Sequence, residues 1–312
     1  MSNINRKLFF IINPLAKNGL SYRVWEQIKG KLANIQYKAY FTEARGDATN
    51  IVKRIASTEK KELLFIAVGG DGTIHEVING AISYPHAVVG YIPAGSGNDF
   101  ARGYQIPLNP KKATEVILTL LNESAESFDA GCYTGKQSGY FINSIGAGFD
   151  AEISRKANGS KMKKWLNIFS LGSLIYVFFL IMELFRYQPT TLNLIIDGKK
   201  EVFYRTWFVT VSNQPFYGGG MKIAPKADPQ DGEFNIVVVH NLSRIKLLFV
   251  FISVFWGTHI NYKEVDLYKG KNISINYSSP LPAHADGENI GETPLFIKLS
   301  KHRWRVLTNN KT

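Results

Sequence analysis

The sequence predicts two domains, a doubly wound α/β domain followed by an antiparallel β-sandwich domain. Its 312 residues suffice for two domains of ordinary size. Up to about residue 124, short apolar runs alternate with amphipathic helical stretches, and beyond that point short β-type alternation dominates. We therefore expect domains over residues 1–124 and 125–312, with the last strand packing back on the first domain.

The first domain is expected to alternate strands with helices. Strands are predicted where short apolar or alternating runs end at turn residues, over residues 7–12, 36–42, 62–68 and 87–93. Helices are predicted where apolar residues recur at helical spacing, over residues 21–32, 47–57, 73–82 and 110–121. Such an alternation is typical of a parallel sheet that helices cover on both faces.

The second domain is expected to be rich in strands, with two apolar segments set among them. The predicted strands cover residues 190–197, 202–212, 232–240, 271–277 and 294–299. Residues 165–182 carry no charge over 18 positions, which just reaches the lower length of a membrane-spanning helix. Polar residues dilute the first half of this segment, so we expect a buried or interfacial helix there. The same interpretation is given to residues 247–257.

The composition indicates the cellular compartment and the chemical class of the partners. The single cysteine, Cys132, permits no internal disulfide, and the first apolar run is too short for a signal peptide, so we expect a cytoplasmic protein. The 37 basic and 25 acidic residues give a net charge of +12, which favours an anionic partner such as a nucleotide or an acidic membrane surface. Nucleic acid is not expected as a partner, because no nucleic-acid-binding motif accompanies this charge.

Two glycine-rich turns follow predicted strands of the first domain. The first, from Gly69 to Thr73, leads into a helix, where glycines allow close backbone approach and the helix N-terminus favours an anion. Asp71 in this turn repels phosphate unless a divalent cation lies between them, so it is interpreted as a metal or nucleotide residue. Thr73 and Glu76 have the spacing of a capping box, which predicts that they stabilise the start of this helix.

The second glycine-rich turn runs from Ala94 to Arg102. Two such turns at the carboxyl ends of parallel strands form a ligand crevice, and a nucleotide fits it. Neither turn matches the P-loop or the dinucleotide-binding pattern, which disfavours those enzyme classes. Two acidic elements occur later, in residues 224–232 and 284–288, and each contains the Asp-Gly pair of a hairpin turn.

These elements together resemble the bacterial diacylglycerol kinase-like lipid kinases, a family that includes sphingosine and ceramide kinases. The resemblance rests on GGDGTIHEVING from Gly69, PAGSGNDFAR from Pro93, APKADPQDG from Ala224 and DGE from Asp286. It also includes FINSIGAGFDAEI, the Asn13-Pro14 pair and Thr42, so that it covers almost the whole chain.

The resemblance implies an ATP-binding α/β domain, a lipid-binding β-sandwich domain and an active site in the cleft between them. Its nucleotide contacts map onto Thr42, Gly69, Gly70, Asp71, Gly72, Thr73, Ile74, His75 and Ser96. Asp286 is implied as the general base for the lipid hydroxyl, with Glu288 beside it. The structural Mg²⁺ site that the resemblance implies maps onto the carboxylate of Asp231 and onto the backbone carbonyls of Asp228 and Glu233, with Asp71 linked through water.

Two alternative functions remain open at the level of sequence. One is a NAD kinase-like kinase of a soluble acceptor, and the other is a lipid-sensing protein without catalysis. A lipid kinase accounts for more features, because the apolar segments can line a cleft for lipid tails or enter the bilayer surface, while basic residues hold an anionic membrane. We therefore expect a peripheral protein at the inner face of the membrane. The sequence identifies neither the lipid nor the oligomeric state.

Overall fold

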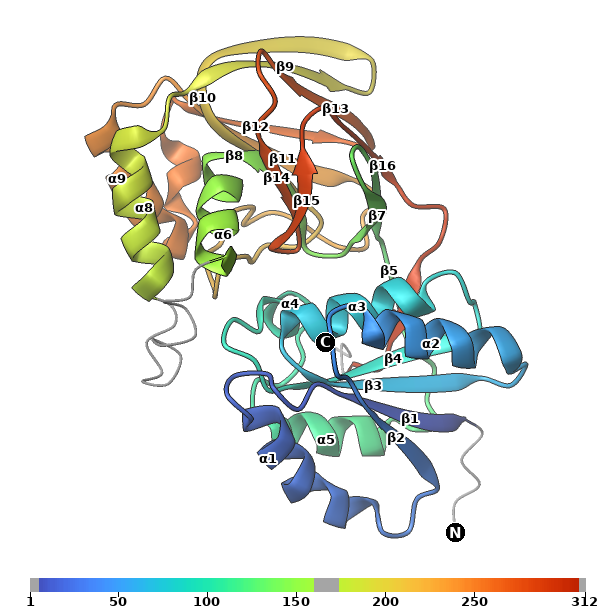
Figure 1. Cartoon of the computed structure of the whole chain (residues 1–312). Coiled ribbons are helices and arrows are strands. Elements are labelled where there is room, and N and C mark those ends of the chain that lie inside the picture. Colours follow the sequence, from blue (N-terminus) through green and yellow to red (C-terminus); the bar gives the residue numbers. More distant parts are fainter. Residues whose placement is uncertain (1–5, 160–173, 309–312) are drawn as a thin grey trace. The chain divides into compact units, whose positions relative to one another are not determined.

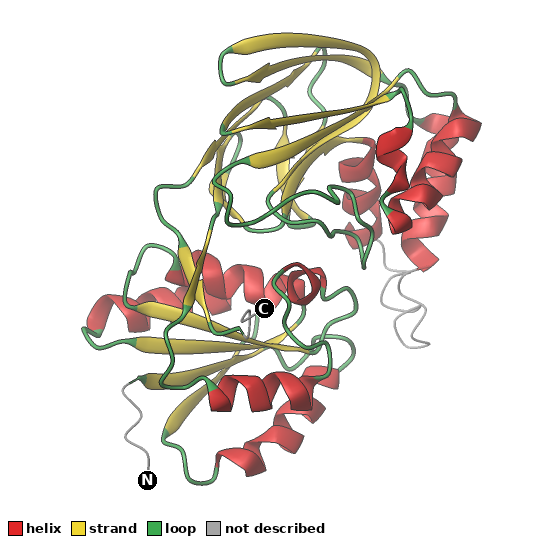
Figure 2. Cartoon of the chain, turned by 180° about the vertical axis from the view of Figure 1, so that it is seen from behind, coloured by secondary structure: helices red, strands yellow, loops and turns green. Residues whose placement is uncertain are grey.

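The computed structural model describes residues 6–159 and 174–308 and divides into two compact units. Unit 1 consists of Met1–Phe128 together with Lys301–Thr312, and unit 2 consists of Asp129–Ser300. Each unit has its own sheet and its own hydrophobic core (Figures 1 and 2).

Unit 1 contains a six-stranded sheet with the order β2-β1-β3-β4-β17-β5. Neighbouring strands are parallel except for the pair β17 and β5. The strands are β1 Lys7–Ile12, β2 Tyr37–Phe41, β3 Leu63–Gly69, β4 Ala87–Pro93, β5 Glu126–Phe128 and β17 Trp304–Val306. The helices are α1 Leu20–Ile28, α2 Asp47–Thr58, α3 Asp71–Ala81, α4 Asp99–Gly103 and α5 Pro110–Thr119, with a 3-10 turn η1 at Lys29–Leu32.

Helices cover both faces of this sheet. α2 and α3 lie against one face, and α1 and α5 lie against the other (Figures 1 and 2). Every residue of β3 and β4 is buried, as expected for central strands of a covered parallel sheet. α5 begins where the side chain of Asn109 accepts the N–H groups of Lys111 and Lys112, and Pro110 occupies the first helical position. The predicted doubly wound architecture is therefore confirmed.

Unit 2 contains an eleven-stranded sheet in which every pairing is antiparallel. Its strands are β6 Gly131–Thr134, β7 Ser138–Phe141, β8 Ser144–Gly148, β9 Thr190–Ile196, β10 Lys199–Ser212, β11 Phe234–His240, β12 Val265–Gly270, β13 Asn272–Tyr277, β14 Pro282–Ala285, β15 Glu288–Glu292 and β16 Leu295–Leu299. Its helices are α6 Phe149–Gly159, α8 Leu174–Arg186 and α9 Arg244–Ser253, and two 3-10 turns follow at η2 Val254–Trp256 and η3 Thr258–Asn261.

The long strand β10 connects the two halves of this sheet. Its first part pairs with β9, and its last part, from Phe208 to Ser212, pairs with β8 and β11. The register shifts between Phe203 and Thr206, where Arg205 has a φ of 52°. Such an irregularity bends a strand and lets a sheet fold around its own core. The predicted antiparallel β-sandwich is confirmed in this form.

The two apolar segments are helical where the structure describes them. α8 contains the second half of the segment 165–182, and residues 165–173 lie outside the described residues. The segment 247–257 forms most of α9 and the turn η2. Within the described ranges, no helix has the length and apolar character needed to cross a bilayer.

Candidate active site

The carboxyl ends of four parallel strands lie at one edge of the sheet in unit 1. Ile12 of β1 pairs with Phe41 of β2 and with Val68 of β3. Val68 in turn pairs with Ile92 of β4. Thr42 and the two glycine-rich loops directly follow these positions, so the structure brings them to the edge where ligands bind in open α/β sheets.

The first glycine-rich loop carries the chain from β3 directly into α3. This helix begins at Asp71, two residues before the predicted start. The carbonyl of Gly70 accepts the N–H groups of Thr73 and Ile74 at 3.0 and 3.2 Å, which closes the first turn. N–H groups at a helix start carry partial positive charge and suit an anionic ligand.

The backbones of the two glycine-rich loops lie in direct contact. A Cβ added to Gly95 would lie less than 3.0 Å from the Cα of Gly70. Asn98 supports this contact, because its Oδ1 accepts the N–H of Gly95 at 3.1 Å. The buried Tyr91 hydroxyl lies 3.2 Å from the carbonyl oxygen of Gly69 and 3.3 Å from Asn98 Oδ1. Glycine is therefore required at position 95 for the two loops to meet.

Asp71 holds the second loop through a backbone hydrogen bond. Its Oδ1 accepts the N–H of Phe100 at 3.0 Å, at the start of the short helix α4. Burial raises the pKa of Tyr91 well above its usual value, and the charges of Asp71 and Asp99 raise it further. Tyr91 thus stays protonated as a hydrogen-bond donor. The carboxylate that the sequence interpretation assigns to a metal or a nucleotide thus has a structural role.

The predicted capping box of Thr73 and Glu76 does not form at the start of α3. Because this helix begins at Asp71, Glu76 lies in its second turn instead of at the capping position. Its carboxylate accepts the N–H groups of Gly46 and Ala48, at 2.9 and 3.2 Å. Glu76 therefore stabilises the start of α2, and the prediction that it stabilises the start of its own helix is wrong.

The remaining residues expected to contact the nucleotide differ in exposure. Thr42 is buried, and its N–H donates to the carbonyl of Ile12 at 2.9 Å. Ser96 is exposed within the second loop. His75 is half-buried in the second turn of α3, with its Nε2 3.3 Å from Asn79 Nδ2. All of these residues belong to unit 1.

Asp286 and Gly287 form the two-residue turn between β14 and β15. Their φ angles of 49° and 81° are those of a tight hairpin turn, so the Asp-Gly signal is realised as a turn. The Asp286 carboxylate also accepts three backbone hydrogen bonds. Ile142 donates to Oδ2 at 2.9 Å, and Asn143 and Ser144 donate to Oδ1 at 2.8 and 3.0 Å. These donors stabilise its negative charge and fix its orientation.

Glu288 is half-buried and begins the strand that follows this turn. It pairs with Ala285 across the hairpin, which places it on the strand next to the Asp286 turn. Asp286 and Glu288 therefore lie on the same hairpin, two positions apart.

The acidic loop of residues 228–233 forms an ion pair with a lysine. Asp231 Oδ2 lies 2.7 Å from Lys269 Nζ, and Asp231 Oδ1 accepts the N–H of Glu233 at 3.0 Å. Asp228 Oδ1 instead accepts the N–H of Gln230 at 2.9 Å. Among the described residues, no three His, Cys, Asp or Glu side chains are grouped so as to hold a metal ion.

Two buried residues connect the acidic loop with the Asp286 hairpin. Asn213 Nδ2 donates to the carbonyls of Ile142 and Asp129, at 3.0 and 2.8 Å. Asp129 Oδ2 then accepts the N–H of Gly232 in the acidic loop at 2.9 Å. Because the N–H of Ile142 donates to the hairpin carboxylate, one network fixes both motifs. Sequence reasoning missed these two residues, whose partners are far apart along the chain.

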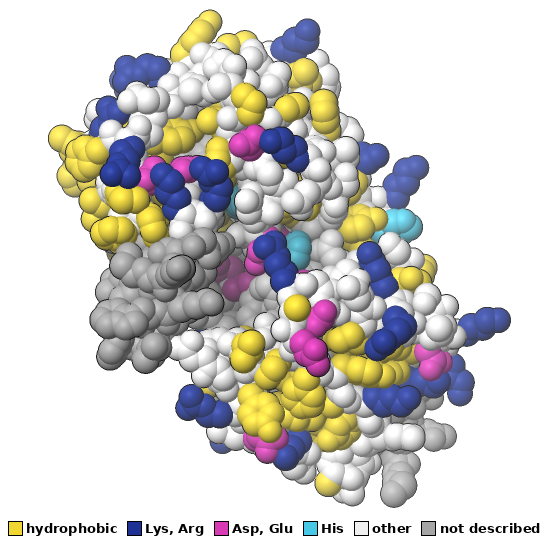
Figure 3. All heavy atoms as spheres, in the orientation of Figure 1, with side chains coloured by type: hydrophobic (Ala, Val, Ile, Leu, Met, Phe, Trp, Pro, Cys, Tyr) yellow, Lys and Arg dark blue, Asp and Glu magenta, His cyan; other side chains and the backbone are white. Residues whose placement is uncertain are grey.

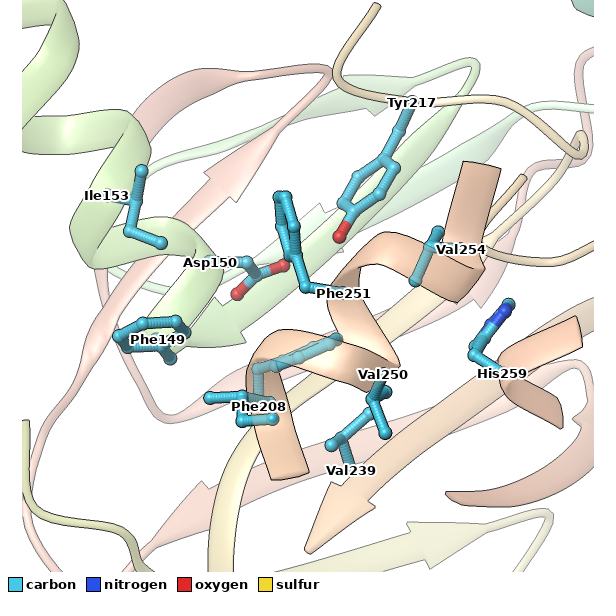
Figure 4. Close-up of a pocket in the computed structure, with 11 residues that line it drawn as sticks. Phe149, Asp150, Ile153, Phe208, Tyr217, Val239, Val250, Phe251, Val254 and His259 are labelled. Carbon is cyan, nitrogen blue, oxygen red and sulfur yellow. The ribbon is translucent and has the colours of Figure 1, made fainter. Parts of the chain in front are cut away.

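An apolar pocket lies beside the sheet of unit 2 (Figure 4). Figure 4 shows side chains converging on it from α6, β10, β11 and α9. Its lining is formed by Phe149, Asp150, Ile153, Phe208, Tyr217, Val239, Leu247, Val250, Phe251, Val254 and His259. The pocket is small, and its lining is almost wholly apolar.

Asp150 is the acidic residue in this otherwise largely apolar lining. Its Oδ2 accepts a hydrogen bond from Thr210 Oγ1 and lies close to His284 Nε2, both at 3.2 Å. Asp150 lies within the motif FINSIGAGFDAEI, and His284 lies two residues before Asp286. The motifs thus contained both residues, but nothing in their spacing indicated that they meet.

Comparison with known proteins adds family relationships to this geometry. Residues 7–132 match the family model described as diacylglycerol kinase catalytic domain. Residues 143–308 match the model described as YegS C-terminal NAD kinase beta sandwich-like domain. The two matches together cover both units.

Two curated relatives and one solved structure match nearly the whole chain. The chain is 33% identical over 309 residues to the "Putative lipid kinase YtlR" of Bacillus subtilis (strain 168), covering 96% of this chain and 99% of the relative. It is 31% identical over 307 residues to a diacylglycerol kinase of the same strain, covering 96% of each. A crystal structure from Bacillus anthracis str. Sterne, described as a "putative diacylglycerol kinase", has the same fold, with a TM-score of 0.80 at 24% identity, covering 99% of this chain and 97% of that chain.

Proposed function

Because this chain belongs to the bacterial diacylglycerol kinase-like family of lipid kinases, we propose that it transfers the γ-phosphate of ATP, with Mg²⁺, to a hydroxyl group of a diacylglycerol-like lipid. The observation that carries this proposal is the backbone contact between the two glycine-rich loops in unit 1. The proposal assigns the phosphate donor to unit 1 and the lipid acceptor to unit 2.

The loop from Gly69 to His75 is proposed to hold the phosphates of ATP. Its glycines place no side chain between the backbone and a ligand, and the N-terminus of α3 adds favourable partial charge. Thr42 and Ser96 belong to the same edge of the sheet and are proposed to contact the rest of the nucleotide. Kinase relatives make a nucleotide the expected donor.

A Mg²⁺ ion is proposed at the acidic loop. Its donors would be the carboxylate of Asp231 and the carbonyl oxygens of Asp228 and Glu233, an all-oxygen set that suits this hard cation. In the structure the ammonium group of Lys269 stands 2.7 Å from Asp231 Oδ2 and 3.9 Å from Glu233 Oε2, so the loop already attracts positive charge. Bound there, Mg²⁺ would neutralise the Asp231 carboxylate and hold the acidic loop in place, as a structural ion does.

Asp286 is proposed as the base that removes the proton of the lipid hydroxyl. Three backbone donors hold its carboxylate in one orientation, which favours a directed proton transfer. Glu288 on the same hairpin adds negative charge beside it. The small apolar pocket on the α9 side of the sheet is proposed to contact an apolar group of the acceptor.

The experiment is an assay with γ-labelled ATP and Mg²⁺, in which diacylglycerol in mixed micelles, a total lipid extract and NAD⁺ are offered separately. We expect label in the lipid products and none in the NAD⁺ reaction. Asp286→Asn serves as the control, and it should give far less labelled lipid than the wild type. Label transferred to NAD⁺ alone would instead support a kinase of a soluble acceptor. The absence of labelled product in all three reactions would favour the non-catalytic alternative.

The lipid acceptor also implies a place of action. We propose that the protein works at the inner face of the cytoplasmic membrane as a peripheral enzyme. Its net charge of +12 supports attraction to anionic lipids.

A further inference from the structure

From Phe178 onward, where its side chains are described, the exposed side of α8 is apolar up to its last residue. The exposed residues there are Phe178, Ile181, Phe185 and the terminal Arg186. Glu183, the acidic residue of this helix, is instead buried and paired with Lys156 at 2.7 Å. This is the reverse of a helix that faces water, where charged residues lie outside and apolar residues lie inside.

The adjoining helix α9 and the turn η2 show the same reversal. Their exposed residues are Ile245, Phe249, Ile252, Phe255 and Trp256. The opposite side of the same segment packs into the core or lines the apolar pocket of Figure 4. A helix that is apolar around its whole circumference is normally buried on every side. One side of α9 is covered by unit 2, and the other side is not.

The end of α8 and the start of α9 are in contact. Arg244 at the start of α9 donates hydrogen bonds to the carbonyls of Leu184 and Tyr187, at 3.0 and 3.3 Å. Figure 3 shows hydrophobic side chains gathered where Figure 1 draws these helices, with Lys and Arg and a few Asp or Glu side chains among them. We name this surface the α8/α9 face and define it by Phe178, Ile181, Phe185, Ile245, Phe249, Ile252, Phe255 and Trp256.

Two exposed cationic side chains lie beside the α8/α9 face. Arg186 ends α8 and is exposed. The exposed Lys222 lies next to η2, because its N–H donates to the carbonyl of Val254 at 2.9 Å. The nearby acidic side chain of Glu264 is paired with Lys246 at 2.7 Å. An apolar surface with a cationic rim is complementary to a bilayer that contains anionic lipids.

We infer that the α8/α9 face docks on the surface of an anionic bilayer, with its aromatic and aliphatic side chains entering the boundary between headgroups and acyl chains. This inference rests on the proposed function, because a lipid acceptor brings the enzyme to a membrane. Trp256, 69% exposed, supports a bilayer as the occupant, since tryptophan is enriched at membrane interfaces. A second copy of the chain would bring two cationic rims together, which is unfavourable.

Docking in this way also explains why α9 is apolar on both sides. Its outer side would lie in the bilayer boundary, and its inner residues Leu247, Val250 and Phe251 line the small apolar pocket of unit 2. Only the thickness of one helix would then separate the bilayer from the pocket. A lipid could thus reach the pocket with little exposure of its chains to water.

The test compares two phenylalanines of nearly equal exposure in unit 2. Phe249 on the α8/α9 face is 61% exposed, and Phe296 on β16 is 58% exposed. Flotation of the full-length protein would be measured with vesicles of phosphatidylcholine alone and with added phosphatidylglycerol, without ATP, for the wild type, Phe249→Glu and Phe296→Glu. We expect Phe249→Glu to weaken binding to the anionic vesicles at least about tenfold. The substitution replaces a phenylalanine that docking would bury in the bilayer boundary with a charged side chain. Phe296→Glu should bind like the wild type.

Equal binding by both variants would overturn the inference, as would wild-type binding that is indifferent to lipid charge. Size-exclusion chromatography with light scattering tests the second-copy alternative. A wild-type dimer that Phe249→Glu converts to a monomer, with vesicle binding unchanged, would assign the face to self-association and refute docking. Flotation needs no turnover, so a difference between the variants would stand even if no lipid were phosphorylated.

Discussion

Replacing Gly95 by alanine tests whether the contact between the two glycine-rich loops creates the nucleotide site. The added Cβ would lie less than 3.0 Å from the Cα of Gly70 and 3.0 Å from Asn98 Oδ1. Carbon atoms in contact prefer separations of about 3.5–4.0 Å, so one loop must move by at least about half an ångström. Overpacking of this kind costs about 1–3 kcal/mol. A displacement near 1 Å at the phosphates would lower catalysis by about 10²-fold.

The assay is ATP binding by calorimetry together with kcat/KM on a lipid acceptor. Gly30→Ala is the matched control, because no atom lies within 4 Å of its added Cβ. We expect the control to stay within about 0.5 kcal/mol of the wild type in unfolding free energy. We expect Gly95→Ala to lose ATP affinity and kcat/KM together. Wild-type ATP affinity in a folded Gly95→Ala protein would refute the assignment of the nucleotide to these loops.

Three further predictions concern single side chains. Asp286→Asn should lower kcat by about 10² or more with ATP affinity retained. It should also lower the free energy of unfolding, because an amide cannot accept all three backbone hydrogen bonds. A kcat within threefold of the wild type would remove Asp286 from the mechanism. Asp71→Asn keeps an acceptor for the N–H of Phe100, so it should retain stability but lose Mg²⁺-dependent activity. Asp71→Ala should lose this activity and also about 1 kcal/mol of stability. Equal unfolding midpoints for the two variants would contradict the role of Asp71 at the start of α4. Burial lowers the pKa of His259, so the unfolded chain binds the proton more readily and stability should fall as pH drops through about 6.5. His259→Gln should flatten this part of the profile of unfolding midpoint against pH. An unchanged slope would exclude His259 as its source.

The sequence pattern predicts best those strands in which almost every residue is buried. β1 and β4 have the predicted bounds, because uninterrupted apolar runs between turn residues leave no other arrangement in a covered parallel sheet. α3 begins two residues earlier than predicted, since the glycine-rich turn is shorter than its composition suggests. The pattern thus predicted the order of the strands and helices of the first domain better than the ends of the helices.

Contacts between distant segments could not be predicted from spacing. Glu76 has the spacing of a capping residue for its own helix, but it stabilises the start of α2, because helix packing brings Gly46 within reach. Asn213 likewise connects two motifs only because β10 brings it next to Ile142 and Asp129. Neither residue type nor sequence position carries this information. The motif residues themselves were identified because their types match a known family pattern.

The acidic residues of the motifs show why the site and the fold are difficult to separate. Asp71 holds the N-terminus of α4, and Asp286 holds the chain from Ile142 to Ser144. A carboxylate that binds backbone donors is fixed in direction, and a fixed direction is what a base or a metal contact needs. Alanine at either position would therefore remove the structural contact together with the proposed chemistry. Asparagine at position 71 separates them, because it keeps the acceptor oxygen and removes the charge.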